Sequence, residues 1–218
     1  MTGYGDIRKQ LIEAGLNPLK INDRLVDVQV NARINFLRDF SVISPEAENK
    51  DLSVAEGGVF QGEFAKEINR WFPLHKLFLF DTFEGFDARD ISSDKEKGFS
   101  NSTKENYLSD TSVELVLNKL PHKEKAVVRK GFFPDTAKGL ENEKFLFVNI
   151  DFDLYDPILE GLRFFYPRMV DGGVILVHDF FSVGYKGVRA AVDKFEVENG
   201  KLIKFPIGDH ISIGIMKK

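Results

Sequence analysis

Ionisable side chains directly follow most of the short apolar runs of this chain. The residues at the run ends are Glu56, Asp81, Gly131, Asp151 and the pair His178-Asp179. If the runs are parallel strands, their carboxyl ends meet at one edge of a sheet, and ligands bind in the crevice outside that edge. Any one of these side chains could instead be a helix cap or a solvated loop residue. Taken together, they indicate a ligand site rich in carboxylates.

The first of these run ends is rich in glycine. The segment Glu56-Gly57-Gly58-Val59-Phe60-Gln61-Gly62 separates an apolar run from a helical pattern. Its glycines let the backbone approach a ligand, and the following helix N-terminus offers free N–H groups. Asp81 ends the next run, where an acidic side chain can accept hydrogen bonds from both hydroxyls of a ribose. A tight turn would also explain the glycines, but the combination predicts an adenosine-containing ligand.

Asp151 and Asp179 end consecutive apolar runs that are separated by one helical pattern. If the two strands are neighbours, their backbones lie about 4.8 Å apart, and the two carboxylates repel one another. A divalent cation would relieve this repulsion, as would a shared proton or a nearby lysine. His178 is either a third metal ligand or a histidine that hydrogen-bonds a carboxylate. We expect a divalent metal site at Asp151 and Asp179, with His178 as the third candidate ligand.

The elements that must position these residues alternate between strand and helix patterns from residue 53 onward. The strand-like runs are apolar on both faces, as in parallel strands covered by helices, and read SVAEGGVF, KLFLFD, AVVRKG, FLFVNID and GGVILVHD. Helical patterns between and after them include one that Asp156 opens with Pro157 at its first position. Two last runs flank Gly208-Asp209 and predict a hairpin from Lys201 to Met216. The prediction is an α/β fold, a doubly wound, mostly parallel seven-stranded sheet with a C-terminal antiparallel hairpin.

Three segments outside the strands also carry predictions. Two amphipathic helices, broken at Asn17-Pro18, are expected in the first forty residues, the first of them containing Ile7 and Leu11. Residues 1–50 would thus form a helical extension to one domain over 51–218, serving as a lid, a substrate wall or a homodimer contact. Residues 82–103 form a long polar connection, a second candidate lid. Thr111 and Glu114 have capping-box spacing at the start of a helix ending near Lys119.

Composition excludes several classes of protein. The chain has no cysteine, which excludes disulfides, zinc–thiolate sites, iron–sulfur clusters and cysteine nucleophiles. Its 34 acidic and 30 basic residues leave no basic surplus, so nucleic acid is not an expected partner. Its longest apolar stretches are of strand length and its N-terminus has no hydrophobic signal region, so we expect a soluble cytoplasmic protein without membrane contact. Most of its 21 phenylalanines should lie in the core.

Several motifs, in this order along the chain, resemble those of the macrocin O-methyltransferase family. They are E-x-G-V-x-x-G from Glu56, D-T-F-E-G-F from Asp81, K-G-F-F-P-D-T from Lys130, D-F-D-L-Y from Asp151, and Y-P-R from Tyr166 before Gly172-Gly173-Val174. The resemblance covers about residue 53 to the C-terminus. It implies a class I, Rossmann-like methyltransferase domain that uses S-adenosyl-L-methionine and a divalent metal to methylate sugar hydroxyls in natural-product biosynthesis.

The resemblance also implies residue roles. Glu56, Gly57, Gly58 and Gly62 would surround the methionine part of the cofactor, Asp81 and Thr82 the ribose, and Gly131 and Phe132 the adenine. Asp151, also next to the cofactor, and Asp179 would bind the metal, Mg²⁺ in most members, with Mn²⁺ as an alternative. The base would be Asp151, or else Asp153. The chain departs from the family at two positions. Gly57 stands where Cys is common, a change that we expect to be harmless. His178 stands where Asp is common, and this change alters the set of metal ligands.

The chemistry expected of such a site is methyl transfer to a hydroxyl. An unassisted sugar hydroxyl is too weakly acidic at neutral pH, so a metal would fix and activate the oxygen while an adjacent aspartate takes its proton. The alternatives are an NAD(P)-dependent oxidoreductase, which lacks its glycine fingerprint here, and a non-catalytic cofactor-binding protein. The acceptor would be a small hydroxylated molecule such as a saccharide, which the sequence does not name.

Overall fold

A single seven-stranded sheet forms the centre of the molecule in the computed structural model, which describes residues 12–15, 18–99, 104 and 107–218. The strands are β1 (Ser53–Gly57), β2 (Lys76–Asp81), β3 (Ala126–Lys130), β4 (Phe145–Ile150), β5 (Met169–Val177), β6 (Ile203–Pro206) and β7 (Ile213–Met216). Their order is β3-β2-β1-β4-β5-β7-β6. The first five pair in parallel, and β7 pairs antiparallel with both β5 and β6. The predicted fold class is confirmed, and the terminal hairpin lies within the main sheet.

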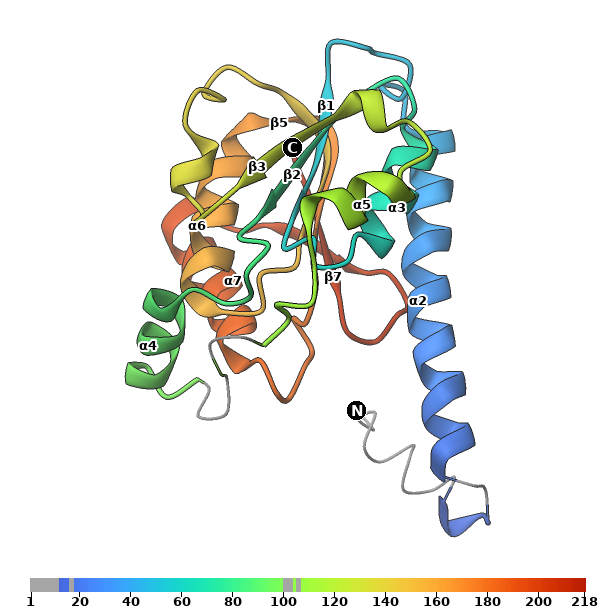
Figure 1. Cartoon of the computed structure of the whole chain (residues 1–218), viewed down its shortest axis with the longest axis vertical. Coiled ribbons are helices and arrows are strands. Elements are labelled where there is room, and N and C mark those ends of the chain that lie inside the picture. Colours follow the sequence, from blue (N-terminus) through green and yellow to red (C-terminus); the bar gives the residue numbers. More distant parts are fainter. Residues whose placement is uncertain (1–11, 16–17, 100–103, 105–106) are drawn as a thin grey trace.

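Helices cover both faces of the sheet (Figure 1). One face packs against α6 (Tyr155–Phe165) and α7 (Lys186–Asn199), the other against α3 (Glu63–Trp71), α5 (Val113–Lys119) and the C-terminal half of α2 (Pro18–Ile43). Because both faces are covered, every residue of β1 and β4 is buried. Phenylalanines fill much of both layers, including Phe72 with Phe147 and Phe133 with Phe165. The doubly wound pattern and the phenylalanine core are therefore as predicted.

The N-terminal helix α2 begins at Pro18, where the sequence predicts a break. Proline suits the first turn of a helix, because its missing N–H would have no intrahelical partner there. Leu37 and Phe40 anchor the helix in the core beside Phe72 and Phe147. Ile7 and Leu11 of the earlier predicted helix lie outside the described residues. No helix in the described part of the chain has the length and apolarity to cross a bilayer.

Two predicted helix starts are wrong, the start of α5 by one residue and the start of α6 by two. Helix α5 is capped by Ser112, whose hydroxyl accepts from Leu115 N at 3.1 Å, while the Thr111 hydroxyl donates instead to the Phe60 carbonyl. Helix α6 begins at Tyr155 rather than with Asp156 and Pro157. Its first N–H donates to the buried carboxylate of Asp94 at 2.9 Å, so the cap comes from another element of the fold.

The polar connection predicted over 82–103 contains a helix. Asp87 accepts a hydrogen bond from Arg89 N at 2.9 Å and thereby caps α4 (Ala88–Glu96). The helix packs against α6 and buries Ile91. Residues 100–103 lie outside the described part, and the predicted lid role stays a prediction.

Candidate active site at the carboxyl edge of the sheet

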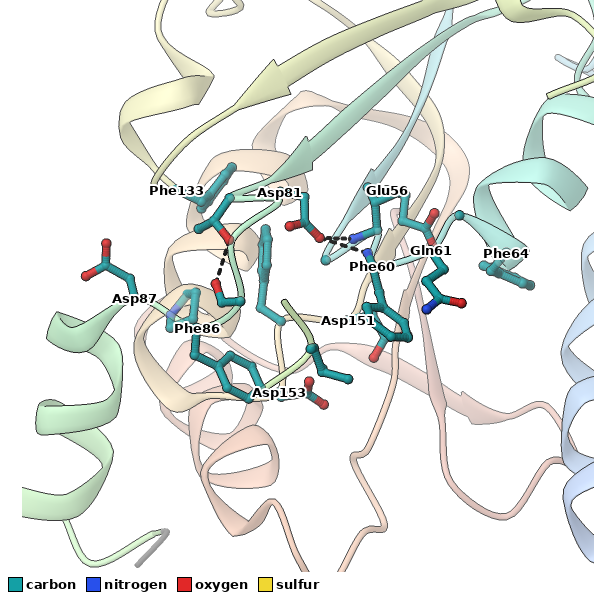
Figure 2. A pocket seen from close by; sticks show the side chains of 18 of the residues that line it. Glu56, Phe60, Gln61, Phe64, Asp81, Phe86, Asp87, Phe133, Asp151 and Asp153 are labelled. Atoms are coloured by element: carbon teal, nitrogen blue, oxygen red, sulfur yellow. Dashed lines mark hydrogen bonds between the residues drawn. The ribbon is translucent and has the colours of Figure 1, made fainter. Parts of the chain in front are cut away.

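A pocket of about 320 Å³ opens at the carboxyl edge of β1 to β4 (Figure 2). It brings together nine of the predicted site residues: Glu56, Gly58, Gly62, Asp81, Thr82, Gly131, Phe132, Asp151 and Asp153. Gly57 does not line the pocket, and the ring of Phe152 fills the space that a side chain at position 57 would take. His178 and Asp179 lie next to Asp151, beyond the pocket lining. The strand-end rule therefore placed the predicted residues together.

The glycine-rich loop after β1 lies directly on the end of β4. Gly58 has φ +80°, and a Cβ there would come within 2.0 Å of the Asp151 carbonyl oxygen. Gly62 has φ +79° at the start of α3, where a Cβ would meet Val116 at 2.8 Å. Glycine is required at both positions, because the backbone is left-handed and the space is already filled. The loop is thus held close against the strand that carries Asp151.

Asp81 holds this loop through its carboxylate. Its Oδ2 accepts from Val59 N at 2.7 Å and Phe60 N at 2.8 Å (Figure 2). Its Oδ1 accepts from Phe83 N at 2.6 Å. A carboxylate oxygen has two lone pairs, so Oδ2 is fully used and Oδ1 keeps one acceptor site. Asp81 therefore anchors the loop, a role that the sequence did not suggest, and retains room for one further hydrogen bond rather than two.

A polar chain across the pocket floor links β1, β4 and α2. Asn149 Nδ2 donates to Glu56 Oε1 at 3.0 Å, and Arg33 Nη2 reaches Asn149 Oδ1 and Asp151 Oδ2, each at 3.3 Å. Burial, reinforced by the nearby charge of Asp151, raises the pKa of Glu56 well above its usual value. Glu56 Oε2 and Arg33 Nε are both buried without a hydrogen-bond partner. Sequence reasoning missed Arg33 entirely; Asn149 was visible as the one polar residue in a buried run.

Asp151, His178 and Asp179 form a cluster where β4 and β5 end side by side. Ile150 pairs with Val177, so the next residues of both strands meet as predicted. His178 Nδ1 lies 2.9 Å from Asp151 Oδ1 and 2.7 Å from Asp179 Oδ2. One ligand atom from each of the three residues lies within 4.8 Å of the others. Their ligand atoms are close enough together to be able to hold one metal ion.

The protonation of this cluster follows from its charges. Burial alone would lower the pKa of His178, but Asp151 and hydrogen bonds to both carboxylates outweigh it and raise that pKa to about 10. Burial would raise the pKa of Asp151, but His178 and Arg33 lower it to about 2. His178 is therefore an imidazolium when no metal ion is bound, and its charge offsets those of Asp151 and Asp179. The guanidinium of Arg33 also offsets the charge of Asp151.

Asp153 completes the carboxylate group in an unusual backbone conformation. Asp153 has φ +64° and Asp179 φ +56°, in the left-handed region that residues other than glycine adopt rarely and that clusters at functional sites. Burial, together with the charges of Asp151 and Asp179, raises the pKa of Asp153 well above its usual value. A protonated Asp153 beside an ionised Asp151 gives the two predicted base candidates opposite protonation states.

The far end of the pocket is an aromatic slot between the loop after β3 and the start of α4. Phe132 and Phe133 line it, and the Arg89 guanidinium lies 3.5 Å from the centre of the Phe132 ring. Asp90 of α4 also lines it, with a pKa that burial, and then the charge of Asp87, raise to about 7. A slot with aromatic walls and a few polar groups suits a flat heterocycle.

Comparison with known proteins agrees with this geometry. Residues 64–213, more than half of the chain, match the family model of macrocin-O-methyltransferase (TylF). No curated protein sequence matches the chain. Among solved structures, the O-methyltransferase NovP is 18% identical with a TM-score of 0.66, covering 86% of this chain and 80% of its own. The calicheamicin methyltransferase CalS11 is 14% identical with a TM-score of 0.65, covering 96% and 89%.

A Bacillus cereus O-methyltransferase in complex with SAH shares the fold at 12% identity and a TM-score of 0.53, with 97% of each chain covered. These likenesses show the methyltransferase fold, and the family match shows the activity, which sets aside the oxidoreductase and the non-catalytic alternatives. The chain belongs to the macrocin O-methyltransferase family and is an S-adenosylmethionine-dependent O-methyltransferase.

Proposed function

We propose that this enzyme methylates a hydroxyl of a sugar or a glycosylated natural product with the help of a divalent metal ion. The observation that carries the proposal is the Asp151–His178–Asp179 cluster, which lies beside a pocket with the residues expected to hold S-adenosylmethionine. The sugar acceptor is supported by the family, and by CalS11, described as a TDP-rhamnose 3′-O-methyltransferase.

The cluster fits a divalent metal by its donor chemistry. It offers two carboxylate oxygens and one imidazole nitrogen, and Asp179 is buried. Carboxylates suit Mg²⁺ and Mn²⁺, and an imidazole in place of a third carboxylate shifts the preference toward Mn²⁺ and other transition ions. Asp151, Asp179 and His178 would hold the ion, with Mg²⁺ as the expected physiological metal. When bound, such an ion lowers the pKa of a hydroxyl that it contacts.

We assign each part of the cofactor to a set of pocket residues. S-adenosylmethionine supplies a methyl group on a positively charged sulfur. The proposed positions are the methionine part between Glu56, Gly58 and Gly62, the ribose at Asp81 and Thr82, and the adenine against Gly131 and Phe132. Gly57 would act only indirectly, by leaving room for Phe152 behind the loop. Asp151 would then be the member of the Asp151–His178–Asp179 cluster next to the cofactor.

Asp153 is the better placed of the two candidate bases. Both oxygens of Asp151 are engaged, Oδ1 by His178 and Oδ2 by Arg33. Repulsion from Asp151 and Asp179 contributes to the raised pKa of Asp153. A cation held by Asp151 and Asp179 would remove this repulsion and lower the pKa of Asp153, while burial, the largest cause of its raised pKa, keeps that pKa above the usual value, which favours a base. We infer that an oxygen of Asp153 takes the proton of the acceptor hydroxyl.

Aromatic side chains provide a surface for the acceptor next to these carboxylates. Burial, followed by the charge of Asp153, raises the pKa of Tyr185, so its phenol stays protonated and can donate a hydrogen bond. Phe86 and Tyr107 stack with ring centres 5.9 Å apart, and Phe181 is exposed just after Asp179. Sugar rings pack on such surfaces through their apolar faces, while their hydroxyls bond to carboxylates.

The metal proposal is tested by titrating Mg²⁺ and Mn²⁺ into chelator-treated enzyme between pH 5 and 9, with methyl transfer to a panel of nucleotide sugars and glycosides measured in parallel. Because a ligating imidazole must lose its proton and the pKa of His178 is raised to about 10, the apparent metal affinity should rise with pH over this whole range. The His178→Ala variant should release one proton fewer, which makes its slope shallower by about one log unit per pH unit.

Equal slopes in the two proteins would remove His178 from the ligand set. Metal-independent methyl transfer by the wild type would overturn the metal proposal while leaving the methyltransferase itself intact. Transfer to none of the sugars, alongside transfer to a simple catechol, would overturn the proposed acceptor class.

Asp81→Ala should weaken binding of S-adenosylhomocysteine by about 1.5 to 3 kcal/mol, because it removes a charge-assisted contact to the ribose and releases the amides of Val59 and Phe60. Calorimetry measures the affinity, and thermal unfolding measures the cost to the loop. Asp135→Ala, at an exposed position after β3, is the matched control. A lower melting temperature with unchanged affinity would make Asp81 a loop anchor only.

A further inference from the structure

Arg33 brings the N-terminal helix into the pocket. Its guanidinium carbon lies 4.3 Å from the centre of the Phe64 ring, and both residues line the pocket near the start of α3. The side chain is 13% exposed. Figure 2 shows Glu56, Gln61 and Phe64 on the side of the pocket that faces α2. An element outside the sheet thus supplies a cation to the end of the pocket opposite the aromatic slot.

The donors of Arg33 are only partly used. A guanidinium has five N–H donors, and Nη2 reaches Asn149 and Asp151 at 3.3 Å, the long end of the hydrogen-bond range. Nε is buried without any partner. A buried donor left unsatisfied costs free energy, so its presence in a pocket wall indicates an acceptor that arrives with a ligand.

Two further features of this end of the pocket complement the charges of a zwitterion. Gly62 is the N-cap of helix α3 and offers no side-chain cap, so the first N–H groups of the helix add a positive end to the same wall as Arg33. Glu56 Oε2, the second buried atom without a partner, offers an acceptor nearby. Arg33 thus has a free hydrogen-bond donor for the carboxylate of an α-amino acid, and Glu56 has a free acceptor for its ammonium group.

We propose that Arg33 binds the carboxylate of the methionine part of S-adenosylmethionine, so that the N-terminal helix completes the cofactor site. This inference rests on the proposed position of the methionine part beside Glu56. Arg33 is a binding residue here: Nε has no partner, so Arg33 can bind the carboxylate through it and keep Nη2 against Asn149 and Asp151. Residues 1–50 then contribute directly to cofactor recognition, in addition to any role as a lid.

Decarboxylated S-adenosylmethionine provides the sharpest test, because it lacks only the carboxylate. The wild type should bind S-adenosylmethionine more tightly than this analogue in calorimetry. Arg33→Met should weaken S-adenosylmethionine about 10- to 100-fold, the range of a charge-assisted hydrogen bond, and leave the analogue unweakened. Arg33→Lys should restore part of the loss. Arg38→Met, on the exposed side of the same helix, should change neither affinity.

The comparison of two ligands on one protein cancels general effects on folding. Equal affinities of the wild type for both ligands would overturn the role of Arg33, and this result needs no variant to fold. Equal weakening of both ligands by Arg33→Met would also overturn it and leave Arg33 as a counterion of Asp151. Failure of the wild type to bind either ligand would instead count against the cofactor positions proposed above.

Discussion

Asp179→Asn should lower kcat/KM for methyl transfer by about 10³-fold, since it removes one negative ligand from the proposed metal site. The change keeps the shape of the side chain. Asparagine also tolerates the left-handed backbone at this position, φ +56°, so the fold should survive. The amide group would further place a donor against the imidazolium of His178, which lies 2.7 Å from Asp179 Oδ2. Metal titration measures the loss of metal affinity, and steady-state kinetics measure the loss of kcat/KM.

Asp153→Asn separates the base from the metal ligands. Position 153 has the same left-handed backbone, φ +64°, so asparagine fits there as well. This variant should keep most of its metal affinity and lose most of kcat, whereas Asp151→Asn should lose both. Asp156→Asn, with its side chain 39% exposed on α6, is the control and should match the wild type. Full activity in Asp153→Asn would return the role of base to Asp151.

The parts of the site that lie at strand ends could be predicted from the sequence. Runs such as FLFVNI and GGVILV are apolar on both faces because both faces are buried, and parallel pairing then brings their last residues to one edge. The positions of Asp151 and of His178 with Asp179 follow from this register alone, through the pairing of Ile150 with Val177. The pattern of apolar residues, which indicates buried parallel strands, was therefore sufficient to predict this part of the site.

Contacts between distant elements could not be predicted in this way. Arg33 reaches Asp151 across 118 positions of sequence, and no periodicity marks a single arginine of a long helix as a pocket residue. The same holds for Asp94, which caps α6 from α4, and for the amides of the loop after β1 that Asp81 binds. In each case a polar side chain pairs with a backbone N–H or a charged group of a different element. Tertiary packing alone determines which element that is.

Gly58→Ala should destabilise the protein by about 2 to 4 kcal/mol and abolish tight cofactor binding. Left-handed backbone costs alanine roughly 1 kcal/mol. The larger cost arises because the new Cβ would lie 2.0 Å from the carbonyl oxygen of Asp151 and 2.6 Å from its carbonyl carbon. Backbone atoms cannot turn aside as a side chain can, so the loop or the end of β4 must move. Denaturant unfolding measures the free energy of unfolding, and calorimetry with S-adenosylhomocysteine measures the affinity of the cofactor site.

Gly98→Ala is the matched control, because Gly98 has a similar φ of +72° and a Cβ there would meet nothing within 4 Å. It should show the left-handed cost alone, so the difference between the two variants isolates the contact with Asp151. A cost for Gly58→Ala no larger than that for Gly98→Ala would contradict the close packing of the loop on β4. Because Asp151 N also donates to Gly57 O at 2.7 Å, a shifted loop should displace Asp151 itself. Gly58→Ala should therefore weaken metal and cofactor binding together, whereas Asp81→Ala, which leaves the end of β4 in place, should weaken the cofactor alone.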